Sequence, residues 1–345
     1  MKRKSNTIQE NDNDFVIDDS NITTRRKKLK LEDPPPIKNL KDLIDVACSN
    51  KFYKNIDMLV LWDILPHLIE LNNMIGMESV KESLFFQIIY YLQGMHTRNI
   101  DGDYLHCIIT GKAGSGKTSL AKIISKIYQH IGILSKNSKF KLAHREDFVG
   151  EYLGQTATKT KKLLNSCLGG VIFVDEIYAL SAGRKDRDSF AKEAIDTINA
   201  FLSEHKNDFV FIGAGYKDDV DKCFFNMNDG LRRRFAWYHN IEEYNHSELS
   251  EILTKMITEN NWELGVSKDF LIKTISENED IFINAGGSCE NLFSKIKLVH
   301  SQRVFGKSSS LKFKINENDI DEAIKMMKKY NSDTRKPEVK YDYYT

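Results

Sequence analysis

The stretch Gly111-Lys-Ala-Gly-Ser-Gly-Lys-Thr118 matches the phosphate-binding loop pattern G-x-x-x-x-G-K-S/T at every fixed position. The mostly apolar run 105–110 precedes the loop and predicts a buried strand. The run 119–128 follows it and predicts a helix, since four apolar residues share one helical face: Leu120, Ile123, Ile124 and Ile127. A strand, a glycine-rich loop and a helix in this order favour a nucleoside triphosphate site.

The residue types of this loop suit phosphate chemistry. Glycines at Gly111, Gly114 and Gly116 let the backbone turn tightly and approach phosphate oxygens, and the amides of the loop and helix start attract an anion. We expect Lys117 to reach the β- and γ-phosphates of ATP, and the Thr118 hydroxyl to bind Mg²⁺. The other residues that we expect to contact the nucleotide here are Lys112, Ala113, Ser115 and Ser119.

An acidic pair follows a second apolar run, at residues 169–176. Four apolar residues that end in Asp175 and Glu176 predict a buried parallel strand, whose carboxyl end is where ligands bind in open α/β sheets. We expect Asp175 to hold Mg²⁺ directly or through water, and Glu176 to polarise the water that attacks the γ-phosphate. The alternative is a strand that ends in a surface acidic pair, which the phosphate-binding loop disfavours.

Further segments complete an α/β pattern. Residues 139–144 and 209–216 read as strands and 189–204 as a helix, and an Ile75-Gly76 turn upstream of the loop is a candidate contact for adenine. Arginines 232–234 suggest a finger that reaches a phosphate, or else a solvated basic turn. Beyond residue 242 the periodicity predicts a small helical domain, with helices at 247–259, 268–277, 289–305 and 318–330.

Composition limits the class of protein. The chain has 345 residues, 41% of them hydrophobic, and a net charge of +1, which gives no global reason to expect binding to nucleic acid or membrane. No apolar run is long enough to cross a bilayer, and no signal peptide is recognisable. Five scattered cysteines argue against a disulfide framework or zinc site and fit a reducing compartment: Cys48, Cys107, Cys167, Cys223 and Cys289. We expect a cytoplasmic protein.

The first 38 residues are polar and read as a disordered tail. Within them, the basic stretch Arg25-Arg-Lys-Lys-Leu-Lys30 is either a nuclear-import signal, which would make the protein nuclear, a nucleic-acid contact, or a solvated part of the tail. Residues 39–73 are expected to form an N-terminal helical segment, 74–241 an α/β nucleotide-binding core, 242–330 a small helical domain and 331–345 a second tail.

Together these motifs resemble the AAA+ ATPases, and within them the branch of red-type Rubisco activases and the sporulation stage V protein K type. The resemblance covers roughly residues 70–305 and rests on four stretches in the family's order: 149–156, 169–176, 214–216 and 230–235. It implies an α/β P-loop NTPase core with a parallel five-stranded sheet flanked by helices, followed by a small helical lid. It also implies a homo-oligomeric ring, usually a hexamer, with ATP between neighbouring subunits.

The resemblance also implies roles for single residues. Arg232 and Arg234 match finger positions that act on the neighbour's γ-phosphate, and Tyr152 with Leu153 matches the aromatic loop that grips a polypeptide in the pore. Two positions depart from the family pattern. Tyr216 stands where a polar sensor, commonly Asn, is found, as in the activase-like branch. The lid helix opens with Ala285-Gly-Gly-Ser288, so that Gly287 stands at the sensor-arginine position, with Arg303 later in the same helix.

Two functions compete at this stage. The first is a ring that hydrolyses ATP and remodels or threads an unidentified protein substrate. The second is a nucleotide-gated assembly or scaffold protein with little turnover, which the missing lid arginine favours. A third, a nucleic-acid motor, rests only on the basic residues 25–30. Because Glu176 and the arginine cluster are both present, the first function is our prediction.

Overall fold

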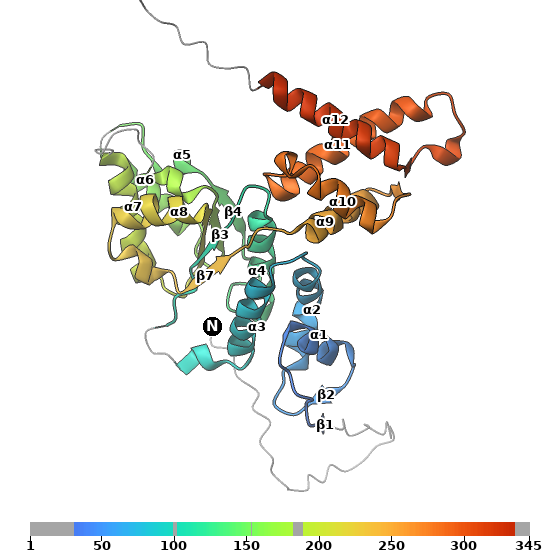
Figure 1. The fold of residues 1–345 in the computed structure, drawn as a ribbon. Helices are drawn as coiled ribbons and strands as arrows, with labels where there is room; N and C mark the ends of the chain where they lie inside the picture. The colour runs from blue at the N-terminus through green and yellow to red at the C-terminus, as the bar shows by residue number, and fades with distance from the viewer. Residues whose placement is uncertain (1–30, 99–101, 153, 182–188, 335–345) are drawn as a thin grey trace, which may run out of the picture.

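A five-stranded parallel sheet forms the centre of the molecule (Figure 1). The computed structural model describes residues 31–98, 102–152, 154–181 and 189–334, so the basic stretch 25–30 and Leu153 lie outside the described residues. The strand order is β4-β5-β6-β3-β7, which confirms the predicted sheet. Its strands are β3 (Cys107–Thr110), β4 (Phe140–Ala143), β5 (Val171–Val174), β6 (Val210–Gly215) and β7 (Trp237–Asn240).

The strands are buried on both faces because side chains alternate between them. In β3, Cys107 and Ile109 join one hydrophobic core, whereas Ile108 joins the core of the opposite face. The first core is covered by α3 (Glu78–Leu92) and α4 (Lys117–Ile131). The second is covered by α5 (Arg145–Phe148), α6 (Thr156–Asn165) and α7 (Ser189–Glu204), followed in the chain by the short α8 (Lys217–Asp219).

The fifth strand, β7, was not identified from its own sequence. Trp237-Tyr-His-Asn240 is short and half polar, as an edge strand often is, so it shows neither an apolar run nor clear alternation. It pairs in parallel with β3 from Cys107↔Trp237 to Thr110↔Asn240. This pairing places β3, and the loop that follows it, in the interior of the sheet.

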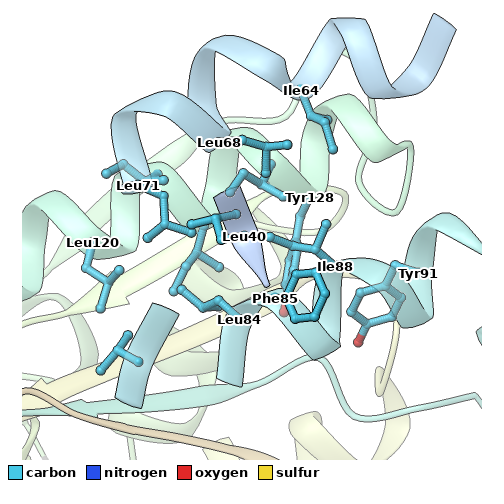
Figure 2. Close-up of a cluster of buried hydrophobic side chains, with 14 of the residues drawn as sticks. Leu40, Ile64, Leu68, Leu71, Leu84, Phe85, Ile88, Tyr91, Leu120 and Tyr128 are labelled. Carbon is cyan, nitrogen blue, oxygen red and sulfur yellow. The ribbon is translucent and has the colours of Figure 1, made fainter. Parts of the chain in front are cut away.

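The N-terminal segment adds a further layer over α4. The expected helical stretch is two helices, α1 (Leu40–Cys48) and α2 (Met58–Asn72), separated by β2 (Phe52–Tyr53), which pairs with β1 (Leu31–Glu32). The Asp57 side chain caps α2 by accepting from the amides of Leu59 and Val60. Figure 2 shows side chains of α1 and α2 meeting those of α3 and α4 in one core. The segment is therefore packed onto the helix that carries the phosphate-binding loop.

The lid follows the core and has a hydrophobic core of its own. It consists of α9 (His246–Glu259), α10 (Lys268–Ser276), α11 (Ala285–Val304) and α12 (Glu317–Thr334), together with a short parallel pair of β8 (Glu263–Leu264) and β9 (Lys314–Ile315). In Figure 1 these helices stand to one side of the sheet. The separate core supports our proposed boundary near residue 242. None of the helices in the described part of the chain is long and apolar enough to cross a membrane.

A buried ionic network joins α11 to α12. The Asp319 carboxylate is 0% exposed and accepts from Arg303 at 2.7 and 2.8 Å, and its Oδ2 lies 3.0 Å from Nδ1 of His300. Burial by itself would raise the pKa of Asp319, but the hydrogen bonds from Arg303 and His300 outweigh burial and lower it. The charged carboxylate therefore stabilises the lid.

We expect Asp319→Asn to lower the free energy of unfolding by about 3 kcal/mol at pH 7, because it leaves Arg303 without its buried partner. Since the folded-state pKa of Asp319 is lowered, its contribution is present above the ordinary value of 3.8 and is lost as the pH falls through the folded-state value. Denaturant unfolding of both proteins at several pH values measures this. Asp321→Asn, at an exposed position of the same helix, is the matched control; equal losses in both variants would contradict the network.

Candidate active site

The phosphate-binding loop connects the end of β3 to the start of α4. Gly114 and Gly116 have φ values of 69° and 91°, a left-handed backbone that favours glycine. The loop is fixed at both ends, because the Gly111 amide donates to the Gly215 carbonyl at 3.2 Å and α4 begins directly at Lys117. The N-terminus of α4 therefore opens onto the concave side of the loop, where its amides favour an anion.

A cavity of about 460 Å³ lies beside this loop and brings together groups from the loop, the ends of β5 and β6, and the lid. The loop contributes Lys117 and Thr118, the end of β5 contributes Asp175 and Glu176, and the end of β6 contributes Tyr216. Its remaining lining residues are Ala113, Gly114, Ser115, Gly116, Ser119, Tyr178, Gly215, Met256, Gly286, Gly287 and Glu290. The cavity thus joins most of the candidate residues, although Gly111 and Lys112 are outside its lining.

Lys117 is turned toward its own loop. Its Nζ donates to the carbonyl oxygens of Gly111 and Lys112, at 2.9 and 2.8 Å, and lies 5.6 Å from the centre of the Tyr216 ring. Burial lowers the pKa of Lys117, while the charges of Asp175 and Glu176 act in the opposite direction. The Lys117 ammonium group therefore lies at the N-terminus of α4, where it could donate to a phosphate oxygen in place of these two carbonyls.

The acidic pair lies on the tight turn after β5. Glu176 has φ 50° and ψ 48°, a left-handed conformation that costs a residue with a side chain roughly 1–3 kcal/mol. Its amide donates to Oδ1 of Asp175 at 3.0 Å. Strain of this kind persists where the surrounding structure imposes it, and it is concentrated at functional sites. The turn directs both carboxylates into the lining of one cavity.

Two tyrosines flank the acidic pair, and Tyr178 was missed by the sequence analysis. Its ring lies 6.0 Å from that of Tyr216, and a Cβ at Gly215 would come within 2.9 Å of it, so the absence of a side chain there makes room for the ring. Burial raises the pKa of Tyr178 to about 12, and the neighbouring Glu176 carboxylate adds to this. The position two residues after Glu176, on a tight turn, was the only sequence signal.

A second cavity, of about 300 Å³, lies between the loop and the start of the lid. Lys112 faces it and forms an ion pair of 2.7 Å with Glu243, while the Tyr244 hydroxyl donates to the Ser115 carbonyl at 2.8 Å. Ser115 Oγ is buried and has no hydrogen-bond partner in the described structure. Lys112 and Tyr244 therefore link the loop to the hinge of the lid, a contact that the sequence analysis did not anticipate.

The Ile75-Gly76 turn lies at this hinge and does not line the cavity of Lys117. A Cβ at Gly76 would lie 2.8 Å from Oε1 of Glu248 in α9. The flanking Met74 and Met77 have their methyl groups 3.5 and 3.2 Å from a Cβ built at Gly116. Contact of this turn with adenine stays a prediction.

The arginine cluster lies far from the loop of its own chain. Because β3 and β7 are parallel and in register, the loop after Thr110 lies at the carboxyl edge of the sheet, whereas the turn 231–234 precedes β7 at the opposite edge. Arg232 pairs with Asp221 at 2.6 Å and lies over the Phe225 ring. Arg234 donates to the Tyr104 hydroxyl at 2.9 Å. Neither arginine is positioned to reach a phosphate bound by the loop of its own chain.

Tyr152 lies in the loop between α5 and α6, and 68% of it is exposed. The Gly150 amide donates to the Thr156 hydroxyl at 3.0 Å, which holds one end of this loop, while Gly154 has φ 81° and nothing within 4 Å of a built Cβ. The ring therefore does not belong to the core, which excludes a role for Tyr152 in core packing in the described conformation.

The parallel sheet, the glycine-rich loop after β3 and the acidic pair after β5 define a P-loop nucleoside triphosphatase. The family model for the ATPase family associated with various cellular activities (AAA) matches residues 107–237. A cfxQ-like protein of Acanthamoeba polyphaga mimivirus is 37% identical over 304 residues, which are 86% of this chain and 74% of that protein. The chain belongs to the AAA ATPase family and therefore binds and hydrolyses ATP.

Other relatives agree with this assignment. Stage V sporulation protein K of Bacillus subtilis is 32% identical over 70% of this chain and 77% of its own length. Protein CbbX of Cereibacter sphaeroides is 33% identical over 59% of this chain and 66% of its own length. Among solved structures, RuvB of Thermotoga maritima has a TM-score of 0.51 at 18% identity, over 74% of this chain and 72% of its own. The FIGL-1 AAA domain has a TM-score of 0.52 at 15% sequence identity, and the match covers 75% of this chain and 88% of that domain. These likenesses confirm the fold.

We expect Lys117→Ala to abolish nucleotide binding, because it removes the only cationic side chain that the described structure places in the lining of the 460 Å³ cavity. Calorimetric titration with ATP and ADP measures the loss. Lys122→Ala, at an exposed position of the same helix, removes an equal charge and should bind as the unmodified protein does. Binding by Lys117→Ala at unchanged affinity would remove this cavity from consideration as the phosphate site.

Proposed function

We propose that this ATPase assembles into a ring, hydrolyses ATP at the boundaries between subunits and uses the cycle to pull on a protein substrate. The observation that carries the proposal is the position of Arg232 and Arg234 at the edge of the sheet opposite to the phosphate-binding loop. A finger in this position is useful only to a neighbouring subunit. The hydrolytic site is then complete only in an assembly.

Within one subunit, the cavity supplies most of the groups for hydrolysis. Lys117 and the amides at the start of α4 would hold the β- and γ-phosphates. Glu176 would accept the proton of the attacking water, because its carboxylate faces the same cavity from the end of β5. Arg232 or Arg234 of the adjacent subunit would stabilise the charge that develops on the γ-phosphate.

Thr118 and Asp175 are the residues that would hold Mg²⁺. A hydroxyl and a carboxylate oxygen are suitable ligands for this ion, and both line one cavity with the lysine that binds phosphate. In the described structure, no group of three or more His, Cys, Asp or Glu side chains could hold a metal alone. This fits an ion that takes its other ligands from water and phosphate. When bound, it neutralises charge on the phosphates.

Tyr152 is our candidate for the group that grips the substrate. An exposed aromatic ring gives contact with an extended chain that tolerates many sequences, and a ring of subunits would gather several copies around one axis. We propose the same role for Leu153, from its match to the family's aromatic loop. The substrate is then a polypeptide rather than a folded surface with one specific epitope.

One observation favours the second candidate function, a nucleotide-gated scaffold with little turnover. The lid has Gly287 at the position of the expected sensor arginine, and Arg303 is bound to Asp319 at 2.7 Å. The described lid therefore offers the cavity no cation that would couple its movement to the γ-phosphate. A steady ATPase rate that is negligible even in the assembled state would favour the scaffold.

We expect Arg232→Ala and Arg234→Ala, tested separately, to identify the finger through loss of about 10³-fold or more in turnover. Each variant has an intact pocket but a changed finger region, whereas Glu176→Gln has intact fingers and a pocket that cannot hydrolyse. Mixing a finger variant with Glu176→Gln should restore part of the activity at interfaces that pair an intact pocket with an intact finger. The activity is measured as phosphate release at fixed total protein. Arg98→Ala, in an exposed turn elsewhere, is the charge-matched control.

Mixed assemblies that form but recover no turnover would contradict a finger that acts between subunits. If neither arginine variant loses activity, the cluster is a solvated basic turn and the ring proposal loses its main support.

We expect Tyr152→Ala to leave the melting temperature and basal ATPase rate unchanged, because its ring is exposed and outside the nucleotide cavity. It should abolish the stimulation of ATPase by an unfolded model protein, casein. Phe305→Ala, which removes a ring that is 89% exposed in the lid, is the matched control and should retain stimulation. Stimulation that persists in Tyr152→Ala would contradict the grip.

A further inference from the structure

The lid reaches the nucleotide cavity through the first turns of α11. Gly286, Gly287 and Glu290 line the cavity together with Lys117 and Asp175, although they lie about 170 residues further along the chain than the loop. The lid is therefore part of the same site, and its charges act on whatever binds there.

The contact between lid and loop is made by backbone atoms. A Cβ built at Gly114 would lie 2.4 Å from the carbonyl oxygen of Asn284 and 2.5 Å from the amide nitrogen of Gly287. A Cβ at Gly286 would lie 2.7 Å from the Gly114 carbonyl oxygen. No side chain fits at Gly114 or Gly286 while the lid is in this position. The described conformation is thus a lid closed tightly on the loop.

The charge that this lid presents is negative. Glu290 is the only ionisable side chain that the described part of the lid contributes to the cavity lining, and it is exposed. The nearest arginine along the same helix, Arg303, is held by Asp319, His300 and the Lys314 carbonyl. Around the cavity, three carboxylates therefore face a single lysine: Asp175, Glu176 and Glu290.

We propose that Glu290 makes the lid discriminate against the γ-phosphate, so that the lid closes more readily over ADP than over ATP. This inference rests on the proposed binding of the phosphates in this cavity. Like charges that face one cavity repel, and the triphosphate carries more negative charge than the diphosphate. Asp175 and Glu176 share the cavity, but bound Mg²⁺ would neutralise the charge of Asp175, and Glu176 would serve as the base that accepts the proton of the attacking water. The Glu290 carboxylate has no such role and moves with the lid.

The lid of this chain should therefore move in the opposite direction, on binding ATP, from a lid that carries a cation at this position. A lid arginine would draw the lid closed over ATP, whereas Glu290 favours an open lid with ATP and a closed lid after the γ-phosphate leaves. Closure would then follow hydrolysis rather than precede it.

The chain leaves room to reverse this charge. A Cβ at Gly287 has only the Asn284 Cβ near it, at 3.9 Å, and the residue lies in a regular helix that lines the cavity. The first atom of a side chain therefore has room at Gly287, in contrast to Gly286. Two independent variants follow: Glu290→Gln removes the negative charge, and Gly287→Arg adds a positive one.

The test compares the dissociation constants of the full chain for ADP and for a non-hydrolysable ATP analogue, adenylyl imidodiphosphate, by calorimetry with Mg²⁺. We expect Glu290→Gln to lower the ratio of analogue to ADP constants about threefold to tenfold, and Gly287→Arg to lower it by at least as much. Glu277→Gln and Ser301→Arg make the same changes at exposed lid positions outside the cavity and should leave the ratio unchanged.

A ratio that is unchanged or higher in Glu290→Gln would overturn the inference, since a carboxylate that helps to hold Mg²⁺ would give the higher value. If Gly287→Arg melts at a lower temperature than the unmodified protein, its affinities are set aside and the ratio measured for Glu290→Gln is the test. Lys117→Ala, titrated in the same series, separates a failure of the proposed phosphate site from a failure of the proposed role of Glu290. If it binds normally, the phosphate site itself is wrong; if it fails to bind while Glu290→Gln keeps the ratio, only the role of Glu290 is wrong.

Discussion

The pairing of β3 between β6 and β7 sets where the functional groups of this protein meet. It places the end of β3 in the interior of the sheet, where the Gly111 amide donates to Gly215 of β6 and the Thr110 carbonyl accepts from Ile241 after β7. The loop is thereby held from both sides. Since parallel strands end at one edge, the acidic pair after β5 and Tyr216 after β6 meet the loop there.

The same pairing separates the arginines from the phosphates. Chain direction alone sends the turn before β7 to the amino edge of the sheet, so the arginines of one chain cannot reach the phosphate-binding loop of the same chain. The lid adds a second dependence, because its backbone contact at Gly114 and its Glu290 carboxylate bring a segment with its own core into the cavity. Under the proposed function, the nucleotide, the lid and the arginines of a neighbouring subunit would all act at this one cavity.

Much of this architecture could be predicted, and the misses have physical causes. The central strands of the sheet are apolar runs because both faces are buried, and β7 escaped detection because a four-residue edge strand can be half polar. The short β8–β9 pair in the lid was missed for the same reason. Tyr178 and Glu290 were missed because a single tyrosine on a turn, or a glutamate on a helix, has no pattern around it.

The phosphate-binding loop, the acidic pair and the apolar central strands can be recognised from the sequence alone, because each depends on neighbours within a few residues along the chain. Three features are visible only in the folded chain: Lys112 turns to the hinge, Arg303 is bound to Asp319, and Glu290 faces the cavity. These facts depend on how the lid packs against the core. Such packing is the sum of many weak contacts between distant segments, and no local pattern records it.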